Sequence, residues 1–319
     1  MFSEGKGCIR LGKVAGIALY LHWSWFLVAY LEITFRRSAY ASVAWNVAEY
    51  LALFGIVLLH ELGHSLACRQ VGGKAEYIVL WPLGGVAVVS PPPRPGAHLW
   101  SIAAGPLVNV VLLPVTIGLC LLVRHVAPPE FQDLVFPFCL AVAGINFLLL
   151  VFNLLPVYPL DGGQILYALL WFILGRARAL RVSCVLGLFG AAGAFLLALS
   201  LQDTWLIILA VFLGYQAIHG LGQARTLTWL QPAVDHLNRA LTLVRQGAAA
   251  EALPECDRAL ELIPQGHELR ENAQACRAMV LAQLGQPPAA ICPTCGAALK
   301  PADQPGAEAC WHCGWKSGA

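Results

Sequence analysis

Residues 54–68 read FGIVLLHELGHSLAC, a run of apolar residues that contains the pattern HELGH at residues 60–64. Two histidines four positions apart lie on one face of an α-helix, about 6 Å apart along its axis, so both rings can bind one zinc ion. Glu61, between His60 and His64, can act as a general base toward a water molecule activated by the metal. The alternative is that the histidines only make polar contacts in a helix bundle. Histidine and glutamate are costly at membrane depth and usually mark function there, which favours the metal site.

The composition of the 319-residue chain is that of an integral membrane protein. Hydrophobic residues make up 58% of the chain and charged residues 12%, with a mean hydropathy of +0.67, whereas a soluble domain is about 25% charged. The predicted fold class is mostly α and polytopic, with a short β element. Three domains are expected: a membrane-embedded domain at 1–222, a cytoplasmic helical segment at 232–288 and a zinc ribbon at 289–319.

Six segments are long enough to cross a bilayer as helices, which takes about 20 apolar residues. They are residues 14–35, 44–68, 99–123, 136–155, 182–201 and 204–221. The apolar segment 163–174 is too short to cross comfortably and predicts a partial or interfacial helix. Residues 71–80 and 84–89 predict a short β-hairpin. Lipid cannot satisfy its polar backbone, so the hairpin is expected at the cytoplasmic interface or against a protein cleft.

The distribution of Lys and Arg predicts the orientation of the chain. With six crossings both termini lie on one side, and ten Lys and Arg residues from Lys6 to Arg225 fall on that side, against Arg36, Arg37 and Arg124 on the other. The chain is therefore expected in the inner (plasma) membrane with both termini in the cytoplasm. Its eleven cysteines form no disulfide framework, which agrees with a soluble region in a reducing compartment.

A catalytic zinc ion takes three protein ligands and leaves one position open. The best candidate for the third ligand is Asp161, in the stretch NLLPVYPLDGG at residues 153–163. Two prolines break the fourth predicted span here, so the carboxylate is expected on irregular backbone that lines a cavity near the cytoplasmic boundary. Gly162 and Gly163 allow another segment to approach closely. The alternative is that Asp161 only caps the helix that follows.

Two further motifs complete a pattern: PLGG at residues 82–85 and AGPLVN at residues 104–109. Together with the histidine motif and Asp161, they make residues 10–222 resemble the site-2 protease family of intramembrane zinc metalloproteases. The six predicted spans, without a PDZ-like insertion between the catalytic spans, resemble the bacterial branch in which a C-terminal regulatory domain is common.

The resemblance implies roles for particular residues. His60, His64 and Asp161 would bind the catalytic zinc, and Glu61 would be the general base. The segment at residues 82–89 would present an edge strand to an unfolded substrate, because a helix hides its peptide bonds from the enzyme.

Four further residues are candidates for contact with the substrate or the oxyanion: Asn109, Asn153, Gly84 and Gly85. The two asparagines would donate hydrogen bonds to the oxyanion or to the substrate backbone. For them, hydrogen bonding between helices of the bundle is an equal alternative.

The soluble region contains two patterns. Arg-Gln-Gly at 245–247 and Gln-Leu-Gly at 283–285 recur 38 residues apart, near the period of about 34 of tetratricopeptide repeats. The segment resembles a degenerate repeat pair, and a plain helical hairpin is an equal alternative. Two C-x-x-C pairs then predict a structural zinc ribbon, with the ligands Cys292, Cys295, Cys310 and Cys313. Lys300 and Lys316 are too few for a nucleic-acid patch, so no nucleic-acid partner is expected.

The sequence thus predicts an intramembrane zinc metalloprotease that cleaves a peptide bond in or near a transmembrane segment of a single-span or membrane-anchored protein. Control by the cytoplasmic C-terminal region, through a regulatory protein, is expected. Two alternatives remain: a catalytically silent membrane sensor on the same fold and a metal transporter. The intact Glu61 argues against the sensor, since a scaffold needs no base. A transporter would carry polar residues along a path across the membrane.

Overall fold

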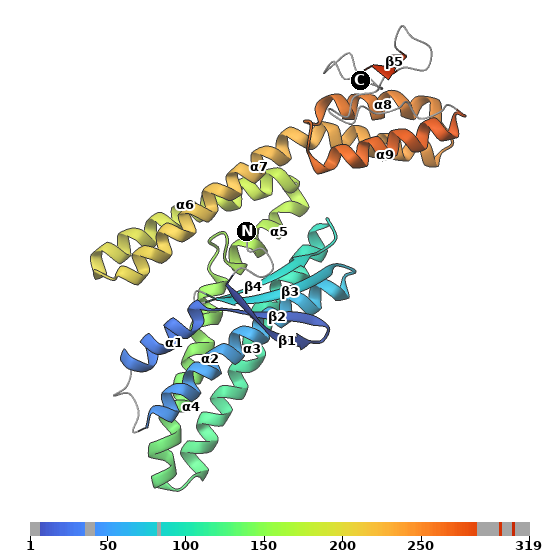
Figure 1. The fold of residues 1–319 in the computed structure, drawn as a ribbon. Coiled ribbons are helices and arrows are strands. Elements are labelled where there is room, and N and C mark those ends of the chain that lie inside the picture. The colour runs from blue at the N-terminus through green and yellow to red at the C-terminus, as the bar shows by residue number, and fades with distance from the viewer. Residues whose placement is uncertain (1–6, 36–41, 82–83, 286–299, 302–307, 310–319) are drawn as a thin grey trace. The chain divides into compact units, whose positions relative to one another are not determined.

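The computed structural model describes residues 7–35, 42–81, 84–285, 300–301 and 308–309 (Figure 1). The chain forms two compact units, Met1–Ala224 and Arg225–Ala319. The four cysteines of the predicted zinc ribbon lie outside the described residues, so the ribbon stays a prediction.

Most of the described chain is helical, as predicted. The first unit contains, in order, β1 (Cys8–Val14), β2 (Ile17–His22), α1 (Ser24–Phe35), α2 (Val43–Gln70), β3 (Lys74–Trp81), β4 (Gly84–Ser90), α3 (Pro95–Val126), α4 (Pro129–Leu154), α5 (Asp161–Leu174), α6 (Arg176–Leu201) and the first part of α7 (Thr204–Arg245). The second unit contains the end of α7, α8 (Ala249–Leu262), α9 (Glu268–Gln283) and the short strands β5 (Lys300–Pro301) and β6 (Glu308–Ala309).

Within the described residues, five helices are long and apolar enough to cross a membrane: α2, α3, α4, α6 and α7. The prediction of a span at residues 14–35 is wrong. This segment forms the end of β1, strand β2 and the 12-residue helix α1, which is only about 18 Å long at 1.5 Å per residue. Ala15 and Gly16 have positive φ angles of 50° and 77° and turn the chain. Residues 17–22 then alternate between buried and partly exposed side chains, which is the period of a strand.

Helix α5 agrees with its predicted short segment, whereas α7 extends well beyond the predicted one. Helix α5 has 14 residues, about 21 Å, so it is as short as the sequence indicates. Helix α7 has 42 residues and runs without a break from Thr204 to Arg245. The chain between residues 222 and 232 is therefore helical.

The first unit contains a four-stranded sheet in the order β1-β2-β3-β4 (Figure 1). The predicted hairpin is present as the antiparallel pair β3–β4. The N-terminal hairpin β1–β2, which sequence patterns did not predict, extends the sheet through a parallel pairing of β2 with β3. Strand β4 is left at one edge of the sheet.

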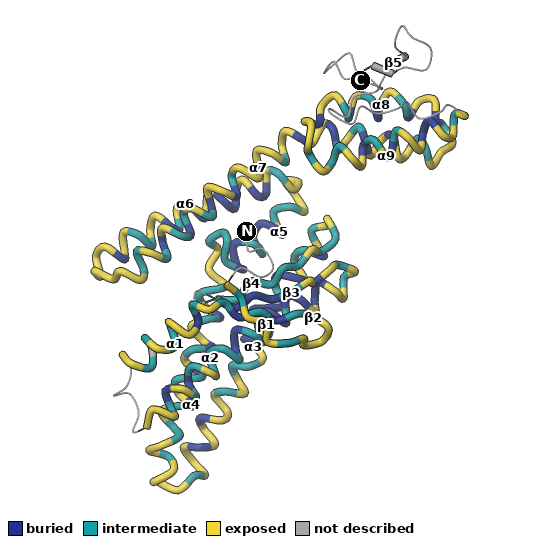
Figure 2. Tube along the Cα trace, viewed as in Figure 1, coloured by how far each residue is buried: buried dark blue, intermediate teal, exposed yellow. Residues whose placement is uncertain are grey.

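One face of the sheet packs on helix α2 and forms a core cluster (Figure 2). Ile17, Ile78 and Leu80 from the strands are 0% exposed, and they join Val57 and Leu62 of α2 in this cluster. Because Leu62 lies within the histidine motif, the same helix supports the sheet with one face and carries the polar residues of the motif with another.

Helices α2 and α3 approach closely at Gly63. A Cβ atom at this position would lie 2.7 Å from the Ala104 carbonyl oxygen and 2.8 Å from Val108 Cγ2. Real Cβ atoms do not come that near another heavy atom, so only glycine permits this helix separation. The glycine of the HELGH motif is thus a packing residue.

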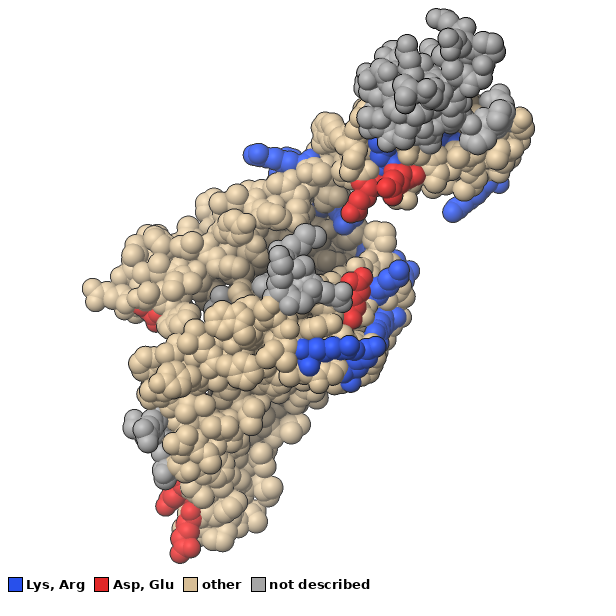
Figure 3. Space-filling model, in the orientation of Figure 1, with Lys and Arg blue, Asp and Glu red and all other residues tan. Residues whose placement is uncertain are grey.

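Lys and Arg side chains gather at the sheet end of the first unit, whereas the far end carries Arg124 of α3 together with Glu130 of α4. Figure 3 shows Lys and Arg gathered over the sheet, and acidic side chains at the far end of α3 and α4. Arg69 lies in the last turn of α2, near the sheet, whereas Glu130 lies in the first turn of α4.

In the second unit, α8 and α9 pack against each other and share a core with the end of α7. Small residues dominate this core, including Ala233, Ala252 and Ala259, which are 0% exposed. Cys256 and Cys276 face each other with their sulfur atoms 3.5 Å apart. Burial, with a contribution from the Cys276 thiol, raises the pKa of Cys256 to about 12, so this thiol stays protonated. The tetratricopeptide-like character of the unit remains a prediction.

The glycine contact between α2 and α3 gives a stability prediction. Gly63→Ala should lower the free energy of unfolding by about 1–3 kcal/mol, the usual effect of overpacking, because the added methyl group must push α3 away. Gly55→Ala is the matched control on the same helix, since a Cβ atom there meets no atom within 4 Å. Thermal unfolding of both variants in detergent checks this, and equal melting temperatures would contradict the proposed contact.

Candidate metal centre

Helix α2 buries His60, Glu61 and His64, and the spacing of four places the two histidines on one face, as predicted. The helix begins after Ser42, whose side chain accepts a hydrogen bond from the Ala44 N–H, and it continues unbroken through the motif. The Nε2 atoms of His60 and His64 lie 3.0 Å apart. Both rings therefore point to the same place.

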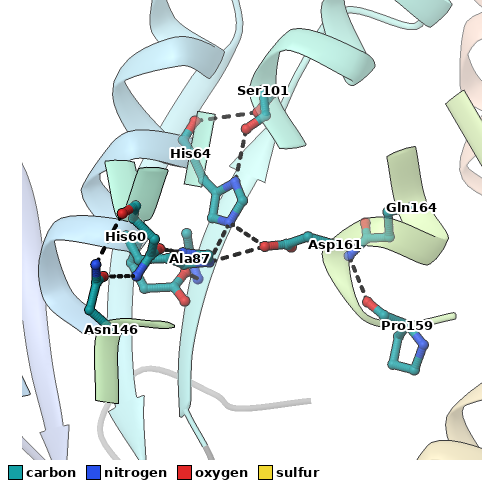
Figure 4. A network of polar contacts seen from close by, with 10 residues as sticks. His60, His64, Ala87, Ser101, Asn146, Pro159, Asp161 and Gln164 are labelled. Carbon is teal, nitrogen blue, oxygen red and sulfur yellow. Dashed lines mark hydrogen bonds and ion pairs between the residues drawn. The ribbon is translucent and has the colours of Figure 1, made fainter. Parts of the chain in front are cut away.

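The turn between α4 and α5 brings Asp161 to these two rings. Its Oδ2 atom lies 3.0 Å from His60 Nε2 and 3.3 Å from His64 Nε2 (Figure 4). The expectation of irregular backbone at Asp161 is wrong by one residue: the turn ends at Leu160, which takes the N-cap position, and Asp161 is the first residue of α5. Asp161 is therefore not the cap of that helix either, and its carboxylate is directed to the histidines.

Glycines after Asp161 let the turn fold back on the end of α4. A Cβ atom on Gly162 would lie 2.3 Å from the Leu154 carbonyl oxygen, and one on Gly163 would lie 2.3 Å from the Tyr158 nitrogen. The close approach expected from the two glycines is thus made by the preceding turn of the same chain. This packing fixes the start of α5, and with it the carboxylate.

Hydrogen bonds behind the rings determine which nitrogen of each histidine carries the proton. His64 Nδ1 lies 2.9 Å from the Ser101 carbonyl oxygen. A carbonyl oxygen only accepts, so Nδ1 donates and Nε2 of the neutral ring is unprotonated. His60 Nδ1 lies 2.6 Å from Asn109 Oδ1 and donates in the same way.

Three atoms with free lone pairs therefore converge in a buried space. Two histidine Nε2 atoms and Asp161 Oδ2 all lie within 4.8 Å of one another, and Asp161 Oδ2 has no hydrogen-bond donor. Without a cation these atoms repel one another. A tetrahedral zinc ion with bonds of about 2.0–2.1 Å holds its ligand atoms about 3.3–3.4 Å apart, close to the observed 3.0–3.3 Å. The donor set thus fits zinc.

Glu61 points toward the sheet and is held there by strand β4. Its Oε2 atom accepts a hydrogen bond of 3.0 Å from the Ala87 N–H. A Cβ atom on Gly85 would lie 2.3 Å from Glu61 Cγ, so only glycine leaves room for the side chain. The carboxylate consequently lies between the edge strand and the two histidines.

The site opens into a cavity of about 460 Å³. Residues from α2, β3, β4, α3, α4, α5 and α7 line it, among them His60, Glu61, His64, Gly84, Gly85, His98, Asn153, Asp161, Gln164 and Phe212. Gly84, Gly85 and Asn153 are thus on the wall of the same cavity as the predicted metal ligands. Their contact with a substrate remains a prediction.

Asn109 has a different position from Asn153. It is 0% exposed, its Oδ1 atom faces His60, and its Nδ2 atom donates to Asn146 at 2.8 Å. Of the two alternatives for Asn109, the hydrogen bonds correspond to contact between helices, and not to contact with substrate.

Sequence reasoning missed two residues behind the histidines. Ser101 acts through its backbone carbonyl, which leaves no signal in the side-chain pattern. Asn146 did have a signal: it is an amide inside the apolar helix α4, and polar residues at membrane depth are costly and often functional.

The space beside His64 gives a test of the metal centre. A Cβ atom on Gly105 would lie 2.2 Å from His64 Nε2, so Gly105→Ala should displace the ring and weaken zinc binding by more than about 10-fold. Gly118→Ala on the same helix meets nothing within 4 Å and should leave the affinity unchanged. Competition with a chelator measures both affinities. Unchanged binding in Gly105→Ala would argue against His64 as a ligand.

Comparisons with known proteins agree with this geometry. The model of peptidase family M50 matches residues 48–127 and 123–199. A zinc metalloprotease of Methanocaldococcus jannaschii is 34% identical over 214 residues, which are 66% of this chain and 59% of that protein. Stage IV sporulation protein FB of Bacillus subtilis is 32% identical over 126 residues, 39% of this chain and 41% of that protein. The chain therefore spans less than two thirds of the length of both relatives.

A solved structure, the site-2 protease from Methanocaldococcus jannaschii, is similar to this chain with a TM-score of 0.50 and 30% sequence identity. The match covers 67% of this chain and 95% of that one.

Proposed function

Because the chain belongs to peptidase family M50, the site-2 proteases, we propose that it is a zinc-dependent endopeptidase of the membrane. Its substrate would be a single-span or otherwise membrane-anchored protein, cut in or near the transmembrane segment. One observation supports this above all: two unprotonated histidine nitrogens and a carboxylate converge beside Glu61 on a cavity wall. The helix that carries the two histidines and Glu61, α2, is long and apolar enough to span the bilayer.

In this proposal His60, His64 and Asp161 hold the zinc ion. When bound, zinc supplies Lewis acidity that activates a water molecule and polarises the scissile carbonyl. Glu61 takes the proton of the attacking water and then donates it to the leaving amine nitrogen. The hydrogen bond from the Ala87 N–H keeps the Glu61 carboxylate at the wall of the cavity that the proposed zinc ligands also line.

Strand β4 is the proposed docking edge for the substrate. It lies at the edge of the sheet, and its glycines, Gly84 and Gly85, line the cavity. An unwound substrate segment can pair with such an edge through backbone hydrogen bonds. Asn153, on the same cavity wall, is the proposed donor to the oxyanion or to the substrate backbone.

The proposed location is the inner (plasma) membrane, with both termini in the cytoplasm. The N-terminal hairpin pairs with β3, directly after the end of α2, and the four long helices that follow α2 would return the chain to the same side of the membrane. The gathering of Lys and Arg over the sheet end of the membrane unit supports this orientation (Figure 3), because positive charge favours the cytoplasmic side. The helices of the second unit and the zinc ribbon at 289–319 would then control access of substrate from the cytoplasm, through a regulatory protein.

Replacing the proposed base, Glu61, distinguishes a protease from a metal transporter and from a sensor. Glu61→Gln keeps the shape of the side chain and its acceptor for the Ala87 N–H but cannot take a proton. It should retain zinc and cleave single-span substrates in liposomes at least about 100-fold more slowly than the parent. Cleavage by both proteins at the same rate would refute the role of Glu61. Equal metal flux through both proteins, with no cleavage, would instead identify a transporter, and ligand binding without cleavage would identify a sensor.

Metal content tests the two proposed zinc sites. The purified parent should hold two zinc ions per chain, Asp161→Ala should retain only the ion of the ribbon, and a Cys292→Ser/Cys295→Ser double variant should retain only the ion of the catalytic site. Each site loses its ion because zinc needs the full ligand set. Elemental analysis by mass spectrometry gives the stoichiometry. Two ions in either variant would rule out the corresponding site.

A further inference from the structure

A chain of hydrogen bonds behind His60 crosses three helices. His60 of α2 lies 2.6 Å from Asn109 Oδ1 of α3, and Asn109 Nδ2 donates to Asn146 Oδ1 of α4 at 2.8 Å. Asn146 Nδ2 returns to the Asn109 backbone carbonyl oxygen at 3.0 Å (Figure 4). Both asparagines are 0% exposed, so these bonds are shielded from bulk water.

The direction of every bond in this chain follows from its last member. The Asn109 carbonyl oxygen can only accept, so it must face the NH₂ group of Asn146. The Asn146 side-chain oxygen then faces Asn109, whose NH₂ group donates to it. The remaining atom of the Asn109 amide, its oxygen, faces His60, and His60 Nδ1 donates to that oxygen. Nε2 of His60 is therefore left unprotonated and free for a metal ion.

We propose that Asn146 is a positioning residue of the metal centre: it fixes the orientation of the Asn109 amide and, through it, the proton on Nδ1 of His60. This inference rests on the proposed zinc site. It extends the ligand set of His60, His64 and Asp161 by two residues that act without touching the ion. Groups behind a histidine ligand commonly set its tautomer and strengthen its binding to metal.

The need for Asn146 follows from the symmetry of the amide. The terminal torsion of asparagine has two wells about half a turn apart, so Asn109 alone could present its NH₂ group to His60. A donor in that place would favour the other tautomer, with a proton on Nε2, where the metal binds. Asn146 opposes this flip, because the flipped amide would set two oxygens against each other. His64 has no such need, since its partner is the Ser101 backbone carbonyl, which cannot flip.

Zinc affinity of the full-length protein tests the proposal. In a Cys292→Ser/Cys295→Ser background, which removes the ribbon site, Asn146→Leu should weaken zinc binding by about 10–100-fold. Leu150→Ala is the control on the same helix, since Leu150 is buried at 8% exposure and has no part in the hydrogen-bond chain. Leu150→Ala should leave the zinc affinity within about 2-fold of the parent, although it removes more buried side-chain atoms than Asn146→Leu does. Chelator competition in detergent gives each dissociation constant, and thermal unfolding reports whether each variant is folded.

A rescue experiment distinguishes positioning from support of the fold. Asn109→Asp offers His60 a carboxylate, whose two oxygens are equivalent and need no orientation. Asn109→Asp/Asn146→Leu should therefore bind zinc about 10-fold or more tightly than Asn146→Leu alone. Parent-like affinity of Asn146→Leu, or no rescue by Asn109→Asp, would overturn the proposal. If Asn146→Leu does not fold, Asn146→Ala carries the same expectation, and failure of both to fold while Leu150→Ala folds would show a structural role only.

The readout also separates this inference from the proposed function. Zinc binding is measured without a substrate, so a parent that binds zinc through His60 but cleaves nothing would refute the protease and leave the positioning role to be judged on the affinities. A parent whose zinc affinity is unaffected by His60→Ala would refute both.

Discussion

Two buried imidazole rings must present unprotonated nitrogens to one point, and most features of the membrane unit depend on this constraint. Lone pairs that face one another in an apolar surrounding repel, so the arrangement needs rigid support as well as a cation. Helix α3 provides much of that support. It contributes the acceptors for both Nδ1 atoms, from Ser101 and Asn109, and Gly105 leaves the space that the His64 ring occupies. The close contact at Gly63 sets the distance between the two helices at which these bonds can form.

The sheet links the base to the same helix. The inner face of the sheet packs on α2 through residues such as Ile78 and Leu80. This packing fixes the distance between the strands and the histidine motif. Edge strand β4 is thereby positioned so that its Ala87 N–H reaches Glu61. Strand β4 pairs with β3 along one edge, holds the proposed base through its Ala87 N–H and, among the described strands, leaves its second edge without a partner. A substrate strand bound at β4 would place its peptide bonds beside the carboxylate that acts on them.

The sequence predicted the parts of this site that depend on local periodicity. Spacing of four along a helix was enough to place His60 and His64 together, and Asp161 was found because a metal needs a third ligand and the prolines before it break a span. The hydropathy pattern gave a wrong prediction at residues 14–35. An apolar run of this length has the same hydropathy whether it forms one helix or a strand followed by a short helix. The turn at Ala15 and Gly16, which divides it, depends on two positive φ angles. The acceptor for His64 is a backbone carbonyl, which no side-chain pattern can reveal.

The two histidines show how a membrane protein satisfies the same requirement in different ways. His64 uses a backbone carbonyl, whose direction the helix already fixes, so one contact is enough. His60 uses a side-chain amide, whose two ends are alike in shape and opposite in hydrogen bonding, so one contact leaves the proton undetermined. A second amide, Asn146, removes that freedom only because it is itself tied to a backbone carbonyl. Among buried residues, a chain of hydrogen bonds keeps one direction only when it ends on a group that cannot turn, and here both chains end on backbone carbonyls of α3.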